Sequence, residues 1–144
     1  MSQRDVCLEL DFAVPPARLW DALTDHASMG KWVGARVRLI VRGDERGVGA
    51  VRRIRLGPSI VDEEVVYADA PRRLVYRVVR GAGLSHHRGE VLIEPKRVND
   101  VEGSHLTWNI RMVTPVPGLS RVMSRVIGAG VGRGLVELRG LIGG

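Results

Sequence analysis

The chain has 144 residues, of which 44% are hydrophobic, so it has the length of one domain and can bury a core. Its formal net charge is +6, but the arginines are spread over nearly every segment without interleaved aromatic residues, which argues against a nucleic-acid partner. The sequence contains no apolar run of roughly 20 residues, no signal-peptide pattern and only one cysteine, which excludes a membrane span, an internal disulfide and a cysteine metal cluster. We therefore expect a soluble, cytoplasmic protein whose residues 1–144 form a single domain.

The N-terminal part predicts one strand followed by two short helices. Polarity alternates over Arg4–Ala13, as in a half-buried strand, and Cys7 within it is expected to be a small packed thiol. Two prolines end this strand and suit the first turn of a helix, after which apolar residues recur at helical spacing. A break with cap-type residues at 25–28 separates this helix from a second one that ends near Gly34.

The middle of the chain contains six further strand patterns separated by turn-forming residues. They cover Ala35–Arg42, Val48–Leu56, Ile60–Ala68, Arg73–Arg80, Ser85–Glu94 and His105–Val113. This spacing is typical of antiparallel hairpins. The polar segment Asn99–Ser104 is predicted to be the turn before the last of these strands.

From about Pro117 the chain predicts one long amphipathic helix. Its middle is unusual because it contains Gly128, Gly130, Gly132 and Gly134. Each glycine costs about 1 kcal/mol relative to alanine in a helix. We expect these glycines to allow close packing against a neighbour or a bend in the helix.

Four segments resemble a known family: VPPARLWDALTDHASMGKW after the first strand, then GVGAVRRIRLG, VVYADAPRRLVYRVV and GSHLTWNIRM. Together with the last helix they resemble the START-like helix-grip (SRPBCC) superfamily, in its polyketide cyclase/dehydrase and lipid-transport branch. The resemblance implies an α+β fold, in which a curved antiparallel sheet of seven strands grips the C-terminal helix over an apolar cavity. Members of the superfamily include ligand carriers, lipid and quinone binders, aromatic polyketide cyclases and co-chaperone-like domains, so the resemblance does not imply one reaction.

Strand alternation and helical spacing select the side chains that should face such a cavity. The expected lining residues are Trp32, Arg52, Ile54, Tyr76, Val78, His87, Val91, Leu106, Trp108, Ile110, Met112, Met123, Ile127, Arg133 and Glu137. This set is apolar with a few polar groups, which is typical of a site for a small molecule.

The polar candidates have alternative interpretations. His87 would suit general acid or base chemistry near pH 7, or would be a solvated or capping residue. Arg52 would hold a carboxylate or an enolate, or would pair with Glu64 or Glu90. Tyr76 would donate a catalytic proton, or would have a structural hydrogen-bond partner.

No P-loop, paired-carboxylate or His-x-x-x-His pattern is present in the sequence, so we expect neither a metal nor a cofactor. The expected function is that of a carrier or sensor that binds a small hydrophobic or aromatic molecule, such as a lipid, a quinone or a polyketide. One alternative is an enzyme of the cyclase or dehydratase type, with His87, Tyr76 and Arg52 as base, acid and anion holder. The other is a protein-interaction or stress-response domain. The sequence leaves both a monomer and a homodimer open.

Overall fold

The computed structural model describes residues 2–81, 86–114, 116 and 118–143 of the chain. Over these residues a single sheet has seven strands: β1 (Ser2–Phe12), β2 (Arg36–Val41), β3 (Val51–Leu56), β4 (Ser59–Asp69), β5 (Arg73–Gly81), β6 (His86–Val98) and β7 (Val101–Thr114). Its helices are α1 (Pro16–Thr24), α2 (His26–Val33) and α3 (Leu119–Ile142). The strand order is β1-β7-β6-β5-β4-β3-β2, and each pair of neighbours is antiparallel.

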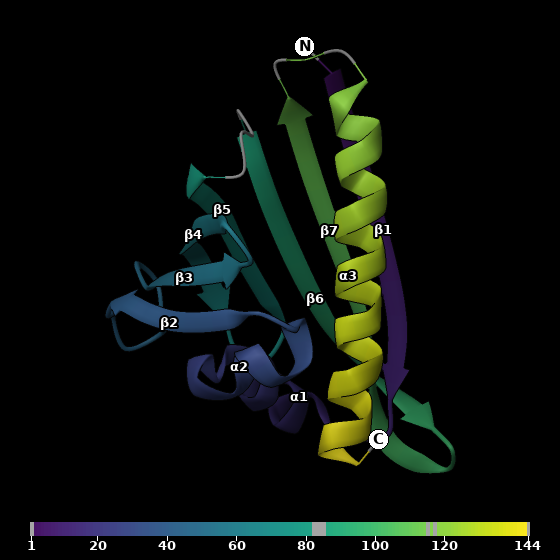
Figure 1. Cartoon of the computed structure of the whole chain (residues 1–144). Coiled ribbons are helices and arrows are strands. Elements are labelled where there is room, and N and C mark those ends of the chain that lie inside the picture. Colours follow the sequence, from purple (N-terminus) through teal and green to yellow (C-terminus); the bar gives the residue numbers. More distant parts are fainter. Residues whose placement is uncertain (1, 82–85, 115, 117, 144) are drawn as a thin grey trace.

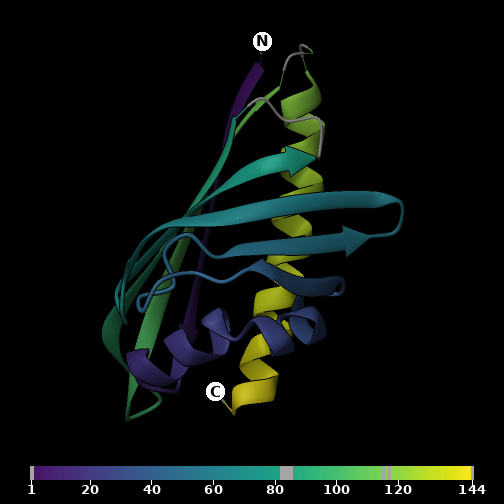
Figure 2. The same cartoon turned by 90° about the vertical axis from the view of Figure 1, so that its left-hand side faces the viewer.

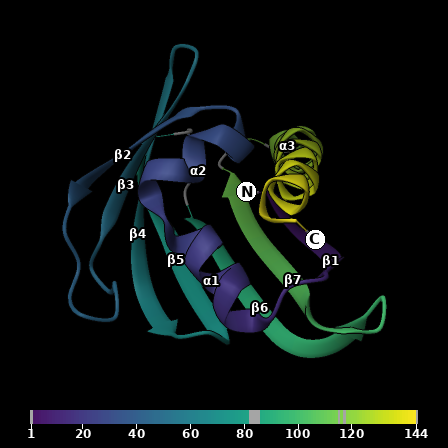
Figure 3. The same cartoon turned by 90° about the horizontal axis from the view of Figure 1, so that it is seen from below.

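The sheet is strongly curved, and the helices lie on its concave side (Figures 1 and 2). The long helix α3 runs beside β1 and also contacts β7, α1 and α2. Figure 3 shows α1 and α2 enclosed by the curve of the sheet, with α3 on the β1 side. This arrangement confirms the helix-grip α+β fold that the sequence predicted. Among the described residues, no helix combines the length and the hydrophobicity that a bilayer span requires.

Local sequence signals explain the two short helices. Pro16 occupies the first turn of α1, where its missing N–H is not needed. The Asp25 side chain accepts a hydrogen bond from the backbone N–H of Ala27 at 3.1 Å and so caps α2. Gly34 ends α2 with φ of 69°, a left-handed conformation that glycine adopts without steric cost. The second helix therefore ends where the sequence predicted.

The hairpin between β6 and β7 is longer than predicted. Val98 pairs with Val101, so the turn consists of Asn99 and Asp100 alone, with φ of 50° and 64°. The expected turn over Asn99–Ser104 was therefore wrong. Asn and Asp tolerate the left-handed region better than other residues with side chains, which allows a tight turn here and lets both strands continue to its edge.

The glycines of α3 have different surroundings. A Cβ atom on Gly134 would lie 2.8 Å from the backbone oxygen of Trp32, so this glycine allows α3 to approach α2 closely. A Cβ on Gly128 would meet Val6 at an ordinary 3.4 Å, and one on Gly130 or Gly132 would have no atom within 4 Å. Close packing therefore explains Gly134 but not Gly130 or Gly132.

The core lies between the concave face of the sheet and the helices. Its fully buried large apolar side chains include Phe12, Ile93, Leu106, Ile110 and Met112 from the sheet, and Leu19 and Leu135 from α1 and α3. Cys7 alternates with the inward residues of the edge strand β1 and is exposed. The expectation of a packed thiol was wrong, because alternation places Cys7 on the face that no helix covers.

Candidate functional site

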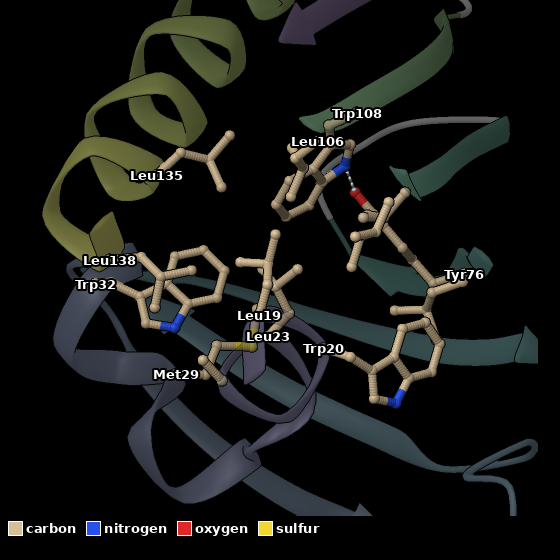
Figure 4. Packing of buried hydrophobic residues seen from close by; sticks show 14 of the residues in the cluster. Leu19, Trp20, Leu23, Met29, Trp32, Tyr76, Leu106, Trp108, Leu135 and Leu138 are labelled. Atoms are coloured by element: carbon tan, nitrogen blue, oxygen red, sulfur yellow. Dashed lines mark hydrogen bonds between the residues drawn. The ribbon is translucent and has the colours of Figure 1, made fainter. Parts of the chain in front are cut away.

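Three aromatic residues from different elements meet on the concave face (Figure 4). Nε1 of Trp108 on β7 donates a hydrogen bond to the Tyr76 hydroxyl on β5 at 3.1 Å. The rings of Tyr76 and Trp108 are nearly perpendicular, with centroids 6.2 Å apart, and Trp32 of α2 packs edge-on against Trp108 at 6.4 Å. Edge-to-face contacts of this kind are a favoured geometry for aromatic pairs. The three rings therefore connect α2 to the middle of the sheet.

Gly89 on β6 makes room for the Tyr76 ring. The two residues are direct partners in the register of β5 and β6. A Cβ atom on Gly89 would overlap the Tyr76 ring. The absence of a side chain at Gly89 thus lets the tyrosine lean across β6 toward Trp108.

Arg52 on β3 is buried with few partners of its own. It is 3% exposed. Its Nη1 donates to the Met29 sulfur at 3.2 Å, and its Nη2 lies 3.9 Å from Oε1 of Glu63, which is too long for a hydrogen bond. Its Nε has no hydrogen-bond partner among the described residues. Burial raises the pKa of the Glu63 carboxyl, and the charge of Arg52 offsets this only in part.

The sequence proposed Glu64 or Glu90 as partners of Arg52, and both were wrong. Glu64 pairs with Arg77 at 2.7 Å, and Glu90 pairs with Arg73 at 2.6 Å. The cause is the turn between β3 and β4, which consists of residues 57 and 58 because Leu56 pairs with Ser59. This register sets Arg52 opposite Glu63, whereas a turn one residue longer would set it opposite Glu64.

Three other buried nitrogen atoms lack a hydrogen-bond partner within the described part of the chain. They are Nε1 of Trp32, Nδ1 of His87 and Nδ1 of His26. His87 faces Tyr76, with ring centroids 6.2 Å apart, and burial lowers the pKa of its imidazole to about 4. His87 is therefore neutral at pH 7. A buried polar atom without a partner costs about 1–3 kcal/mol, so several of them on one face call for an explanation.

We call Trp32, Arg52, Glu63, Tyr76, His87 and Trp108 the inner-face cluster. Burial raises the pKa of the Tyr76 hydroxyl above its usual range, and the negative charge of Glu63 raises it further. Arg52 acts on this same pKa in the opposite direction. The polar groups of the cluster therefore influence one another electrostatically, although few of them are joined by hydrogen bonds.

The structure places most of the predicted cavity residues on this face. The buried ones are Trp32, Arg52, Tyr76, Val91, Leu106, Trp108, Ile110 and Met112, and the partly buried ones are Ile54, Val78, His87, Met123 and Ile127. Arg133 and Glu137 are exposed on α3 and do not join the others. The rotation of α3 explains this, because Gly134 packs against Trp32 and Leu135 and Leu138 are buried, which leaves Arg133 and Glu137 on the other side of the helix.

The sequence pattern did not identify Glu63 or Met29. Alternation along β6 did place Gly89 on the inward side, but its contact with the Tyr76 ring was not predicted. The alternation of β4 contained a signal for Glu63, because Val61 and Val65 lie two residues to either side of it. The sequence contained no comparable signal for the contact of Met29 with Arg52, which joins α2 to β3 across 23 residues.

Two surface hollows of the described structure lie elsewhere. One, of about 540 Å³, is lined by Ala13, Asn99, Val136, Arg139, Gly140 and Gly143. The other, of about 570 Å³, is lined by Gly30, Gly34, Ala35, Arg36, Arg55 and Gly57. Neither is lined by a residue of the inner-face cluster. Neighbouring residues cover the cluster, since all its members are buried except His87, which is partly buried.

Solved structures of other proteins share this fold. A START superfamily protein from Mycobacterium smegmatis is 14% identical, with a TM-score of 0.77 and 96% of each chain covered. A protein from Thermus thermophilus is 15% identical, with a TM-score of 0.77 and 96% of this chain and 97% of that chain covered. Norcoclaurine synthase from Thalictrum flavum, solved with dopamine and hydroxybenzaldehyde, is 14% identical, with a TM-score of 0.74 and 98% of this chain and 87% of that chain covered.

At such low identity these likenesses show the fold and not the chemistry. A sequence comparison with curated proteins finds no match. The family described as polyketide cyclase / dehydrase and lipid transport matches residues 4–143. Since this match spans nearly the whole chain, the chain belongs to the polyketide cyclase / dehydrase and lipid transport family.

Proposed function

We propose that this chain binds a small hydrophobic or aromatic molecule between the concave face of the sheet and α3, as a carrier or a sensor. The main support is a group of buried nitrogens, on Trp32, Arg52 and His87, that have no hydrogen-bond partner in the part of the chain that the structure describes. They lie in an apolar surrounding. Small-molecule sites typically combine apolar walls with a few polar atoms that orient the ligand. A ligand would supply the partners that these nitrogens lack among the described residues.

Binding requires movement, because the inner-face cluster is covered and the surface hollows lie apart from it. The helix α3 is the element best suited to move. Gly130 and Gly132 lie in its middle without close neighbours, and glycine lowers the cost of bending a helix. A small displacement of α3 from the sheet would open the face on which the cluster lies.

The family supports the same proposal in general terms, since its description includes lipid transport. The Thalictrum flavum enzyme with the same fold was solved with two aromatic molecules, dopamine and hydroxybenzaldehyde. We extend to this chain only the binding of an apolar or aromatic molecule.

The proposal is tested with N-phenyl-1-naphthylamine, a neutral probe whose fluorescence rises in apolar surroundings. We expect saturable binding with one probe per chain. Val78 and Val79 provide a matched pair, because Val78 is partly buried on the inward side of β5 and Val79 is 49% exposed. Val78→Trp should weaken probe binding, and Val79→Trp should leave it unchanged.

Absence of saturable binding, or equal losses in the two variants, would contradict the proposal. Native mass spectrometry of protein purified without detergent adds a second measurement. A retained molecule would give the mass of the natural ligand and hence its chemical class.

One observation favours a second function, an enzyme of the cyclase or dehydratase type. Tyr76 contacts the His87 ring, and the charge of Glu63 raises the Tyr76 pKa. His87 is neutral at pH 7, as a general base must be. With a reactive poly-β-ketone as substrate, Tyr76→Phe and His87→Gln should lower the rate of ring closure while substrate still binds. Undiminished turnover in the double variant would rule out these roles.

A further inference from the structure

We propose that the molecule bound at the inner-face cluster carries an anionic oxygen group, and that the Arg52 guanidinium receives this group. The inference rests on the proposed function and names the chemical class of its ligand. The class is an apolar or aromatic body with one acidic oxygen group, such as a carboxylate, a phenolate or an enolate.

Arg52 has more hydrogen-bond donors than the described residues satisfy. A guanidinium carries five N–H donors, accepts no hydrogen bond and stays charged in proteins. The structure gives it one thioether sulfur, which is a weak acceptor, and leaves Nε without a partner among the described residues. At 3% exposure, solvent does not compensate for this. A buried arginine in this state favours a ligand with strong, paired acceptors.

The adjacent cross-strand pair, Arg53 and Asp62, shows how a carboxylate of the protein can satisfy an arginine on these strands. Arg53 and Asp62 are also direct partners in the register of β3 and β4. Arg53 donates two hydrogen bonds to the two Asp62 oxygens, at 2.9 and 3.1 Å. On the opposite face of the same strands, Arg52 and Glu63 remain 3.9 Å apart. The same two strands thus hold a hydrogen-bonded ion pair on one face and, on the concave face, a pair that is too far apart for a hydrogen bond.

Glu63 is a poor counter-charge for Arg52 for a second reason. Burial raises the pKa of its carboxyl and so favours the neutral form. To the extent that Glu63 is neutral, the charge of Arg52 is uncompensated in an apolar surrounding, which is costly. An anionic ligand would remove that cost.

Helix α2 adds a hydrogen-bond donor beside Arg52, and its residues His26–Val33 include no acidic side chain. Met29 contacts Arg52, and Trp32 is one helical turn further along α2. The Trp32 indole N–H, which can only donate, is buried without a partner among the described residues. His26 lies on the same helix, and burial and then the charge of Arg52 lower its pKa, while the charge of the exposed Asp25 raises it. Hydrogen-bond donors and positive charge therefore lie together beside Arg52. This favours a ligand group that accepts hydrogen bonds over a ligand amine.

The test compares two probes that share one aromatic skeleton. 8-Anilino-1-naphthalenesulfonate is N-phenyl-1-naphthylamine with an added sulfonate, so the ratio of their two Kd values isolates the anionic group. In the natural chain we expect the anionic probe to bind at least about tenfold more tightly, the scale of one charge-assisted hydrogen bond. In Arg52→Met the ratio should fall to near one. Arg55→Met removes an exposed arginine of the same strand and should keep the ratio.

Circular dichroism and a cooperative melting transition verify that each variant is folded. If Arg52→Met does not fold, Glu63→Gln takes its place, because loss of the competing carboxylate should increase the preference for the anionic probe. A ratio of Kd values near one in the natural chain, or a ratio that neither Arg52→Met nor Glu63→Gln changes, would overturn this inference. Saturable binding of the neutral probe would still support the proposed function in that case. If neither probe binds in a saturable way, the proposed function itself fails.

Discussion

The indole N–H of Trp108 reaches the hydroxyl of Tyr76 over 3.1 Å and so joins β7 to β5 across the strand between them. Both side chains are buried, Tyr76 at 3% and Trp108 at 6% exposure. The Tyr76 ring crosses β6 where Gly89 has no side chain. This hydrogen bond therefore fixes the positions of two members of the inner-face cluster, Tyr76 and Trp108.

We predict that Tyr76→Phe and Trp108→Phe each lower the free energy of unfolding by about 1–3 kcal/mol, because each leaves a buried polar atom without its partner. The double variant should cost less than the sum of the two single changes. Chemical denaturation of the four proteins gives the coupling, which we expect to be about 1 kcal/mol. Tyr67→Phe is the control, since Tyr67 is 44% exposed. Strict additivity would show that the hydrogen bond contributes little.

Gly89→Ala should destabilise the fold by about 1–3 kcal/mol, since the new methyl group would overlap the Tyr76 ring. In a Tyr76→Leu background the same substitution should cost much less, because the ring is gone. Thermal melting of the four proteins measures both effects. An equal cost in both backgrounds would mean that Gly89 serves the backbone and not the tyrosine.

The glycines of α3 should respond in opposite directions. Gly132→Ala meets no atom within 4 Å and should raise the free energy of unfolding by about 1 kcal/mol, the difference in helix propensity. Gly134→Ala should lower it, because the Cβ would lie 2.8 Å from a backbone oxygen of Trp32 that cannot easily move. Denaturation of the two variants checks this sign difference. If Gly132→Ala also weakens binding of the neutral probe, flexibility of α3 contributes to ligand entry.

Stability should fall as the pH drops from about 6.5 to about 4 because of His87. Burial lowers the pKa of this imidazole from 6.5 to about 4 in the folded chain. Between these values the unfolded chain takes up a proton that the folded chain excludes, which favours unfolding by at most about 1.4 kcal/mol per pH unit. Free energies of unfolding measured over this range should show a shallower slope in His87→Gln. An unchanged slope would place His87 in a more hydrated environment.

His105 should have the opposite dependence on pH. Its Nδ1 lies 2.6 Å from Asp11 and its Nε2 lies 3.2 Å from Glu9, contacts that raise the pKa of its imidazole above 6.5. Hydrogen bonds from His105 and Lys96 lower the pKa of Asp11 below 3.8.

The stabilisation from His105 is therefore complete below pH 6.5 and is lost as the pH rises through the folded pKa. The stabilisation from Asp11 is present above pH 3.8 and is lost as the pH falls through the pKa of Asp11 in the folded chain. Since these contacts are partly exposed, we expect the free energy of unfolding of the natural chain to exceed that of His105→Asn by less than about 1 kcal/mol. The difference should be greatest between pH 4 and 6.5, and a difference that grows at pH 8 would contradict this assignment.

Much of the fold was predictable because its signals are local. Alternation within single strands identified the inward side of β7, and Leu106, Trp108, Ile110 and Met112 are all buried there. Prolines, a capping aspartate and a left-handed glycine mark the ends of the two short helices, since each acts on the backbone within a few residues. Residues that share β7 could therefore be placed on the correct face.

Relations between elements were decided only by the tertiary structure. Whether Arg52 faces Glu63 or Glu64 depends on one residue of turn length, and a slip of one position changes every partner along a strand. The exposure of Arg133 and Glu137 depends on how α3 is rotated where Gly134 meets Trp32. Sequence periodicity determines which residues share a face, but register and rotation follow from packing between distant segments, because local spacing is the same for each of these arrangements.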